Sequence, residues 1–449
     1  MYEYIYLVVI FIIVGLFAYI KIKYPFWNVQ PVFHTYDFWR YYAQNPFLIQ
    51  HGFPIKTKFC DINKIRTFPY SELTTEQRNQ FVDLLQCHYI PSERIIMTAT
   101  ADTIHPYMTG HNNSAYISFY NEPQYTVVDV SSGTIIQTPE TMPGLSPELS
   151  RSPTPSCYIS IQPITKPIGC ISSRPVRLFL YKKYIENIEA KYTMNEIPAY
   201  FLDHICVHRD HRDKKYSRNL IQTHEYYQRI KNPEILVSLF KKEEDLCEGI
   251  VPLTEFKTYT FYLRNVKIPR LPKHFVVVRI FKENLGILTD FLYEISHPPT
   301  STPLFSACAI PDIGSLTALI NQNQLFVYAL RRENIIFGIY FLKDTKIEYE
   351  DVEGGKLLEC VASISNTESQ GKANGLFFAG FLHALRGIMD LKQTLYKMIL
   401  FDDTGHNGRI LEKWRWKYTP IFQNRAAYYI YNMVVPNMPL PRDQCLFLQ

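Results

Sequence analysis

A run of basic residues follows an apolar segment near the middle of the chain. The stretch "FLDHICVHRDHRDKKYSRNLI", residues 201–221, changes from apolar residues with strand propensity to charged and histidine residues that open a helix. The start of a helix has unpaired N–H groups and a partial positive charge, so a helix opening at Ser217 forms an anion site from its backbone alone. Several cations beside that start favour a polyphosphate, such as the pyrophosphate of coenzyme A, over a single carboxylate; they are Arg209, His211, Arg212, Lys214 and Lys215. A solvated basic face is the alternative, and the stretch alone does not decide between the two.

The sequence argues against several other kinds of site. It contains nine cysteines, an odd number, and they are widely spaced, with no C-x-x-C pair and no histidine cluster at metal-ligand spacing. We therefore expect no metal and no disulfide framework, but buried thiols in a reducing compartment. Neither G-x-x-x-x-G-K-[ST] nor G-x-G-x-x-G occurs, which removes support for nucleotide sites of those classes. The formal charge of +5 is not gathered into Lys/Arg blocks, so nucleic acid is not an expected partner.

The segments around the basic turn predict a globular protein that mixes strands and helices. Apolar positions recur with helical period in "LTTEQRNQFVDLLQCHYI", residues 73–90. The apolar runs of residues 157–185 predict an antiparallel hairpin or meander. Residues 131–156 are rich in Ser, Thr and Pro and predict a flexible surface insertion. A second half that begins near residue 266 repeats the scheme of the first loosely.

The N-terminal segment, residues 1–23, has the composition of a membrane anchor. Residues 4–20, "YIYLVVIFIIVGLFAYI", carry no charge, and at 1.5 Å per residue such a helix spans roughly 25 Å. Glu3 precedes this run and Lys21 and Lys23 follow it, so the positive-inside tendency places the long C-terminal body in the cytosol. A cleaved signal peptide and a buried core helix are the alternatives, and the sequence favours a retained single span.

Four segments, in order along the chain, resemble one enzyme family. "HICVHRDHRDKKYSRNLI" looks like the acyl-coenzyme A signature of the glycylpeptide N-tetradecanoyltransferases, or N-myristoyltransferases. "YPFWNVQPV" resembles the N-terminal segment of that family, "PIGCISSRPVRLFLY" its strands before the signature, and "AAYYIYNMVVPNM" through "CLFLQ" its C-terminal end. The resemblance covers residues 24–449 apart from the insertion. It implies an α/β (α+β) fold of two GNAT-like acyl-CoA N-acyltransferase halves with approximate internal symmetry: residues 24–265 hold acyl-CoA, and residues 266–449 contribute much of the peptide groove.

The same resemblance implies which residues bind the coenzyme. Pro25, Phe26 and Trp27 would lie along it, and the backbone of 212–217 would hold its phosphates. The implied contacts of the signature are His204, Ile205, Cys206, Val207, Arg212, Asp213, Lys214, Lys215, Tyr216 and Ser217.

The catalytic groups implied by the resemblance are main-chain groups. The N–H groups of His204 and Ile205 would form an oxyanion hole for the thioester carbonyl. The general base would be the C-terminal carboxylate, here that of Gln449, because burial raises the pKa of a carboxylate toward neutrality and lets it accept a proton from an amine. A frayed C-terminal end is the alternative. Direct attack by the amine needs no enzyme nucleophile, so Cys206 is interpreted as a packed side chain.

The peptide site matches the family less well than the acyl site does. The acidic loop of the family aligns with "HYIPSERII", where only Glu93 is acidic, and its Arg-Tyr-Trp-His wall aligns with "TFYL". The resemblance then assigns peptide binding to Tyr89, Phe261 and Leu263.

The resulting hypothesis is a monomeric, single-pass membrane N-myristoyltransferase with no prosthetic group. It would use myristoyl-CoA as co-substrate and transfer the acyl group to proteins with an N-terminal glycine. One alternative is a catalytically silent or narrow-specificity relative that serves as a membrane-bound binding or structural component. Another is an acetyltransferase-like enzyme, although the abundance of aromatic residues (15%) favours a pocket for a long acyl chain.

Overall fold

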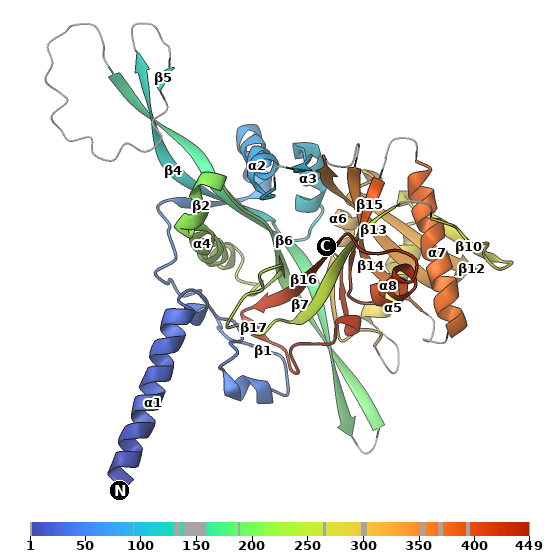
Figure 1. Cartoon of the computed structure of the whole chain (residues 1–449), viewed down its shortest axis with the longest axis horizontal. Helices are drawn as coiled ribbons and strands as arrows, with labels where there is room; N and C mark the ends of the chain where they lie inside the picture. Colours follow the sequence, from blue (N-terminus) through green and yellow to red (C-terminus); the bar gives the residue numbers. More distant parts are fainter. Residues whose placement is uncertain are drawn as a thin grey trace, which may run out of the picture.

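A large sheet with helices packed against it forms the body of the protein (Figure 1). The computed structural model describes residues 2–92, 94–129, 135–137, 159–186, 189–263, 266–297, 303–350, 355–366, 371–391 and 396–448. In this part of the chain, 16 strands form one sheet, and β1 (Phe47–Leu48) and β17 (Met433–Val434) form a separate pair. The insertion predicted at 131–156 lies outside the described residues except for the short strand β5 (Ile135–Gln137).

The first half of the chain forms a meander followed by a crossover. Its four antiparallel neighbours are β2 (Ile65–Pro69), β4 (Tyr116–Asp129), β6 (Ile159–Glu186) and β7 (Glu189–Val207). Helix α4 (Tyr216–Lys231) then leads to β8 (Val237–Glu243), which lies parallel to β7.

The second half repeats this arrangement. Its four antiparallel neighbours are β10 (Phe275–Ile280), β12 (Leu325–Arg332), β13 (Ile335–Tyr349) and β14 (Gly355–Ser365). Helix α7 (Gly371–Met389) then leads to β15 (Tyr396–Asp402), which lies parallel to β14. Strand order, strand direction and the place of the crossover helix agree, so the prediction of a mixed α/β fold with two GNAT-like halves is confirmed.

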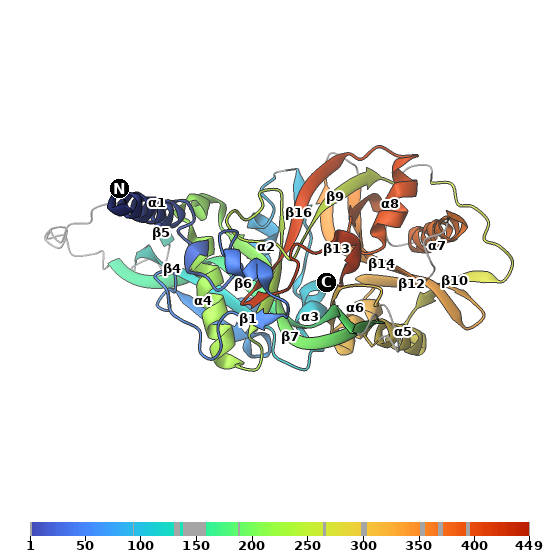
Figure 2. The ribbon, with the colours of Figure 1, turned by 90° about the horizontal axis from the view of Figure 1, so that it is seen from below.

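The two halves exchange one strand each. Strand β9 (Thr254–Tyr262) follows β8 in sequence but pairs with β15, and β16 (Phe422–Tyr431) follows β15 but pairs with β8. The two exchanged strands also pair with each other, and they lie between the halves in both views (Figures 1 and 2). Because of this exchange, β9 belongs by sequence to the predicted first half, residues 24–265, but pairs with β15 of the second half.

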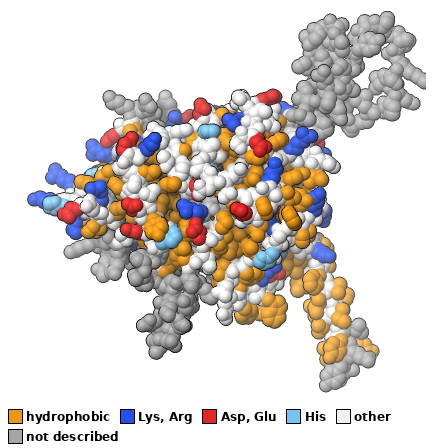
Figure 3. All heavy atoms as spheres, turned by 180° about the vertical axis from the view of Figure 1, so that it is seen from behind, with side chains coloured by type: hydrophobic (Ala, Val, Ile, Leu, Met, Phe, Trp, Pro, Cys, Tyr) orange, Lys and Arg blue, Asp and Glu red, His pale blue; other side chains and the backbone are white. Residues whose placement is uncertain are grey.

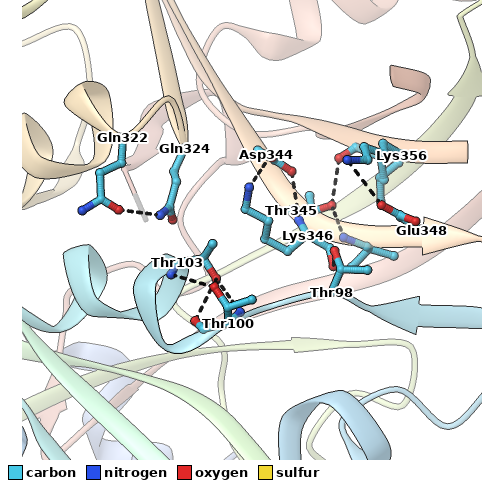
Figure 4. A network of polar contacts seen from close by, with 12 residues as sticks. Thr98, Thr100, Thr103, Gln322, Gln324, Asp344, Thr345, Lys346, Glu348 and Lys356 are labelled. Carbon is cyan, nitrogen blue, oxygen red and sulfur yellow. Dashed lines mark hydrogen bonds and ion pairs between the residues drawn. The ribbon is translucent and has the colours of Figure 1, made fainter. Parts of the chain in front are cut away.

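A second seam joins the first half to β13. Strand β3 (Ile95–Met97) pairs with the end of β13, and the backbone N–H and hydroxyl of Thr98 both donate to the carbonyl of Lys346, at 2.7 and 3.2 Å. Figure 4 shows this polar network, in which Lys346 also donates to the carboxylate of Asp344 through its backbone N–H (3.1 Å) and its Nζ (2.5 Å). The contacts hold the two halves in one register.

One local prediction is wrong. Residues 157–185 are predicted to form an antiparallel hairpin or meander around a turn. The turn is wrong, because β6 continues as one strand from Ile159 to Glu186, whereas β6 does form a meander with β4 and β7. The register shifts near Pro167 and Gly169 show how the strand absorbs a proline and a glycine as an irregularity instead of a turn. By contrast, the predicted amphipathic helix is confirmed as α2 (Thr75–His88), which begins with a capping box at Thr74.

Apolar clusters fill both halves and meet at the end of the chain. Strand β18 (Cys445–Phe447) adds to β11 (Ala307–Pro311), which pairs with β6. Phe447 packs into the core of the first half, and Leu446 and Leu448 pack into a core of the second half. The remaining α-helices of the described chain are α1 (Tyr2–Lys23), α3 (Ala101–Met108), α5 (Gly286–Ser296), α6 (Ile313–Asn321) and α8 (Asn407–Arg415).

Candidate acyl-transfer site

Two parallel strands separate at the point where the apolar part of the signature ends. Strands β7 and β8 pair from Ala199 to Leu202, and the last pair is Leu202 with Phe240. Beyond it, β8 continues beside β16, while residues 203–207 of β7 have no partner in β8. The sheet therefore forks at Asp203, and one edge of β7 is open to a ligand.

A β-bulge lies directly after this fork. In the pairing of β6 with β7, Cys170 faces Cys206 and Ser172 faces Asp203, so His204 and Ile205 together oppose Ile171. His204 has a left-handed backbone, with φ of 51°, which redirects the peptide groups of the bulge. The N–H of His204 donates to the Asp203 carboxylate at 2.8 Å, so one of the two predicted oxyanion donors already has an acceptor.

The imidazole of His204 is held in place by neighbours from β6, from α2 and from the residue that follows α2. Its Nδ1 lies 2.9 Å from the Ser172 hydroxyl, and its ring lies 5.8 Å from the ring of Phe81 and 6.0 Å from that of Tyr89. Burial lowers the pKa of His204, although the nearby Asp203 carboxylate opposes this effect. The ring is therefore neutral at physiological pH.

The basic turn adjoins the bulge along the chain. A short 3₁₀ helix, η5 (Arg209–Lys214), ends at Lys215, whose φ of 61° starts α4 without a side-chain cap and without an acidic residue in its first turn. The first N–H groups of α4 are thus available to an anion. Four cations are exposed around this start and form no ion pair with an acidic group of the described chain: Arg209, Arg212, Lys214 and Lys215.

The cations of the turn differ in their contacts. The Arg212 guanidinium donates to backbone carbonyls, those of Val207 (3.4 Å) and His88, so it braces the turn. Lys214 Nζ lies 3.2 Å from His211 Nδ1. Of the predicted phosphate-binding side chains, Lys214 and Lys215 are therefore better placed for a ligand than Arg212, and Asp213 is exposed beside them.

The aromatic segment after α1 reaches the fork. The ring of Trp27 stacks on Phe240 at 5.9 Å, and Phe240 belongs to the last pair before β7 and β8 separate. Phe26 is buried against Phe59, and Pro25 is half-buried beside it. The structure thus places Trp27 beside the fork between β7 and β8.

Comparison with known proteins identifies the fold. No protein-family model and no curated protein matches the sequence. A crystal structure of Saccharomyces cerevisiae N-myristoyltransferase with bound myristoyl-CoA matches with a TM-score of 0.60 at 11% identity, over 92% of this chain and 93% of that one. A structure of the yeast enzyme with bound myristoyl-CoA and inhibitors matches with a TM-score of 0.61 at 12% identity, over 95% of each chain. The chain has the N-myristoyltransferase fold.

Within this N-myristoyltransferase fold, only one of the three predicted peptide-binding residues lies at the site. Tyr89 is next to His204, and burial, together with the charge of Asp203, raises its pKa well above the usual range. Phe261 and Leu263 are buried in a core of the second half, where Phe261 packs on Phe401 (6.0 Å) and Trp414 (6.2 Å). Glu93 lies outside the described residues.

A buried charge cluster near Tyr89 was missed by the sequence reasoning. Lys241 Nζ donates to Asp402 Oδ1 (3.0 Å), lies 2.8 Å from Asp402 Oδ2, pairs with Glu243 (2.7 Å) and lies 3.9 Å from Glu359. Burial raises the pKa of Asp402 to about 7 against the effect of Lys241. The signal was present in "VSLFKKE" and "MILFDD", where charges directly follow apolar strands.

The C-terminal strand of the N-myristoyltransferase fold ends inside the molecule (Figure 1). Leu448 is buried, and its N–H donates to the carbonyl of Ala309 at 2.9 Å. Gln449, the predicted base, lies outside the described residues. No group of three or more His, Cys, Asp or Glu side chains suited to a metal ion occurs among the residues that the structure describes.

Proposed function

We propose that the chain is a glycylpeptide N-tetradecanoyltransferase, which moves a myristoyl group from myristoyl-CoA to the N-terminal glycine amine of a protein. The observation that carries the proposal is the continuous path from the strand fork at Asp203, through the bulge at His204 and Ile205, to the uncapped start of α4 at Lys215. An extended acyl thioester with a polyphosphate at its far end matches this path. The similar yeast structures hold bound myristoyl-CoA.

In the proposed reaction, the glycine nitrogen attacks the thioester carbonyl carbon, and an amide forms as the C–S bond breaks. The coenzyme leaves as a thiolate and takes up a proton. The bulge would offer the Ile205 N–H, and that of His204 on release from Asp203, to the developing oxyanion. The sequence analysis gave Asp203 no role, but its carboxylate accepts the His204 N–H and so determines whether this donor is available to the oxyanion.

The proposed base is the C-terminal carboxylate of Gln449. Its support is the buried path of β18, whose four described terminal residues, Cys445 to Leu448, are at most 3% exposed. A frayed end would leave this segment at the surface. An amine proton would pass to this carboxylate before or during the attack.

The membrane assignment is part of the same proposal. The described side chains of α1 are exposed except that of Ile20, and residues Tyr4–Lys23 are long and apolar enough to span a bilayer, with a mean hydropathy of 2.7. We propose that the chain is a single-pass membrane protein whose body faces the cytosol; a signal sequence, which has the same length and composition, is the alternative. We also propose that it acts as a monomer, with residues 24–265 holding the coenzyme and 266–449 forming much of the peptide groove.

A specific observation favours a second candidate, a catalytically silent acyl-CoA-binding protein. Lys241 and its three carboxylates lie near Tyr89, where the resemblance expects the substrate amine, and the His204 N–H is bound to Asp203. A protein of this kind would bind the coenzyme without transferring its acyl group.

Neutralising the basic turn tests the binding step. We expect the combined variant Arg212→Gln, Lys214→Gln and Lys215→Gln to bind myristoyl-CoA about 10- to 100-fold more weakly, because each charge-assisted contact to phosphate contributes about 1 kcal/mol or more. Binding is measured by titration calorimetry, and transfer by mass spectrometry on a panel of peptides with an N-terminal glycine.

The matched control removes the same charge from the second half, as Lys267→Gln, Arg270→Gln and Lys273→Gln, at three exposed positions. This variant should bind as the wild type does. Equal affinity in both variants would mean that the turn is only a solvated face. Binding by the wild type without any acylated peptide would support the silent candidate.

A further inference from the structure

The interior of the sheet contains an arginine that lacks an acceptor. Arg174, on β6, is 2% exposed, and its Nε, Nη1 and Nη2 atoms are all buried with no hydrogen-bond partner in the described chain. Its guanidinium lies over the rings of Tyr107 (5.6 Å) and Phe201 (5.4 Å). A guanidinium has five N–H donors, and buried donors in native proteins are nearly always paired, so an acceptor is missing here.

A second cation faces the same place. Lys343, on β13, has its Nζ 5.0 Å from the same Tyr107 ring, and it forms no ion pair within the described residues. The Asp203 carboxylate attracts both cations, and its Oδ1 also accepts the His204 N–H. The Glu359 carboxylate acts on Lys343 as well, but it is shared with Lys241. This group therefore contains two cations and one carboxylate, Asp203, that acts on both, and the Arg174 guanidinium forms no hydrogen bond with it.

The geometry points to a carboxylate as the missing group. Two oxygens in one plane match the fork of a guanidinium, and a second cation adds to the attraction. A phosphate would be harder to admit, because Arg174 has almost no exposure. We infer that Arg174 and Lys343 form a buried carboxylate-binding site beside the bulge of β7.

The course of β18 indicates one source of that carboxylate. Phe447 of β18 pairs with Ala309 of β11, and Pro311 of β11 pairs with Val176 of β6. Arg174 lies two residues before Val176 in β6, on the same face of that strand. The ring of Phe447 also stacks on that of Tyr428, with 4.0 Å between the ring centres, and Tyr428 interacts electrostatically with the Arg174 guanidinium. The final strand therefore runs toward Arg174, which would hold a terminal carboxylate ionised and in place. That last role rests on the proposed function, whereas carboxylate binding itself does not.

The test is a comparison of full-length chains made by ligation at Cys445. The peptide Cys-Leu-Phe-Leu-Gln is joined as the free acid or as the carboxamide, each with Arg174 or with Arg174→Met, and the folding equilibrium is measured by urea unfolding. If the terminus is the ligand, the carboxamide lowers the folding equilibrium constant of the Arg174 chain about tenfold or more, because a hydrogen bond to a charged group is lost. The same change should have a much smaller effect in the Arg174→Met chain. Acetate should then have no effect on the acid chain.

Two other outcomes are informative. If acid and amide chains unfold alike, and acetate stabilises both only when Arg174 is present, the site binds a free carboxylate. If neither the terminus nor acetate matters, and Arg174→Met is as stable as the wild type, the inference is wrong. Arg177→Met is the control, because Arg177 is exposed on the same strand and already pairs with Glu196 and Asp312. None of these readouts requires activity, so failure of the proposed reaction would leave the result interpretable.

A separate observation concerns the surface beside α1. The 3₁₀ helix η2 (Phe38–Tyr42) has inverted polarity: its one charged residue, Arg40, turns inward to the carbonyl of Val32 (2.8 Å) and to Asp37 (2.9 Å). Its aromatic residues point outward and touch one another, with Phe38 against Trp39 (5.9 Å) and Tyr42 (5.3 Å). Trp39 is 84% exposed.

This aromatic surface of η2 lies on the side of the body from which α1 projects. The short blue helix of η2 is on the same side as α1 in Figure 1, and Figure 3 shows hydrophobic side chains at the edge of the body next to the anchor helix. Exposed tryptophan and tyrosine are typical of proteins at the headgroup level of a membrane, where the ring is buried and its polar edge stays wet. Since α1 would fix that edge against the bilayer, we propose that η2 inserts into the membrane interface. This step rests on the proposed anchoring.

Brominated lipid provides the test. The full chain is reconstituted into phosphatidylcholine vesicles with and without bromine on the acyl chains, and tryptophan quenching is compared with that of Trp39→Phe and Trp416→Phe. Trp416 is 85% exposed and lies in the second half, which makes it a matched control. We expect Trp39→Phe to remove most of the quenching and Trp416→Phe to leave it unchanged. Quenching that is equal in all three chains would overturn the proposal, whereas a chain that fails to float with the vesicles would instead contradict the anchoring.

Discussion

Deletion of Gln449 is expected to lower acyl transfer by about 100-fold or more while leaving the affinity for myristoyl-CoA nearly unchanged, because a positioned general base contributes that much to a rate. The deletion moves the terminal carboxylate back by one residue, about 3.3 Å along a strand. The hydrogen bond from the Leu448 N–H to Ala309 does not involve Gln449 and should persist. Single-turnover transfer and calorimetric binding measure the two effects separately.

The control for this deletion is Gln449→Ala, which keeps the carboxylate at the same place in the chain and changes only the side chain. It should retain most of the transfer rate. If the deleted chain were as fast as the wild type, the terminal carboxylate could not be the base, and the buried carboxylates around Lys241 would become the candidates.

Replacement of Glu225 by Gln is expected to stabilise the protein above neutral pH by up to about 3 kcal/mol. This is the free energy that corresponds to the pKa shift of Glu225 on folding. Burial against the sheet raises the pKa of Glu225 from 4.5 to about 7, although Ser238 and Arg229 favour its charged form. Between these two pKa values the folded chain binds a proton that the unfolded chain lacks. This contribution to stability is therefore complete below about pH 4.5 and is lost as the pH rises to about 7.

Urea unfolding across this range, followed by the fluorescence of buried Trp414, measures the effect. The Glu225→Gln chain should match the wild type at about pH 4.5 and exceed it from about pH 7 upward. Glu234→Gln is the control, since Glu234 is exposed just after the same helix. If the stability of Glu225→Gln and wild type fell in parallel as the pH rose, the carboxyl would be ionised in the folded protein, contrary to this prediction.

Much of the fold could be predicted because its signals are local. The helical period of residues 73–90 and the continuous apolar runs of β12 and β14 depend only on which residues lie a few positions apart. The length of β6 could not be predicted, because whether Pro167 and Gly169 form a turn or an irregularity depends on the pairing offered by β4. The exchange of β9 and β16 between the halves could not be predicted either, because the sequence of each strand does not indicate which strand it pairs with.

The candidate site divides in the same way. The bulge residues and the basic turn are adjacent in sequence, so one motif predicted where they lie relative to each other. Phe261 and Leu263 were assigned to peptide binding from alignment alone, and the structure packs them into a core. Which face of β9 is covered depends on α7 and α8, which come more than a hundred residues later.

The sequence by itself determined the mixed fold of two related halves, the amphipathic helix and the basic turn after an apolar strand, because periodicity, charge and helix ends act over a few residues. Only the tertiary structure decided where charge is buried. Lys241, Glu359 and Asp402 come from three strands, and Arg174 and Lys343 from two others, so no local pattern brings them together. The strength of these interactions depends on the loss of water when the halves close, which is a property of the packed chain and not of any segment.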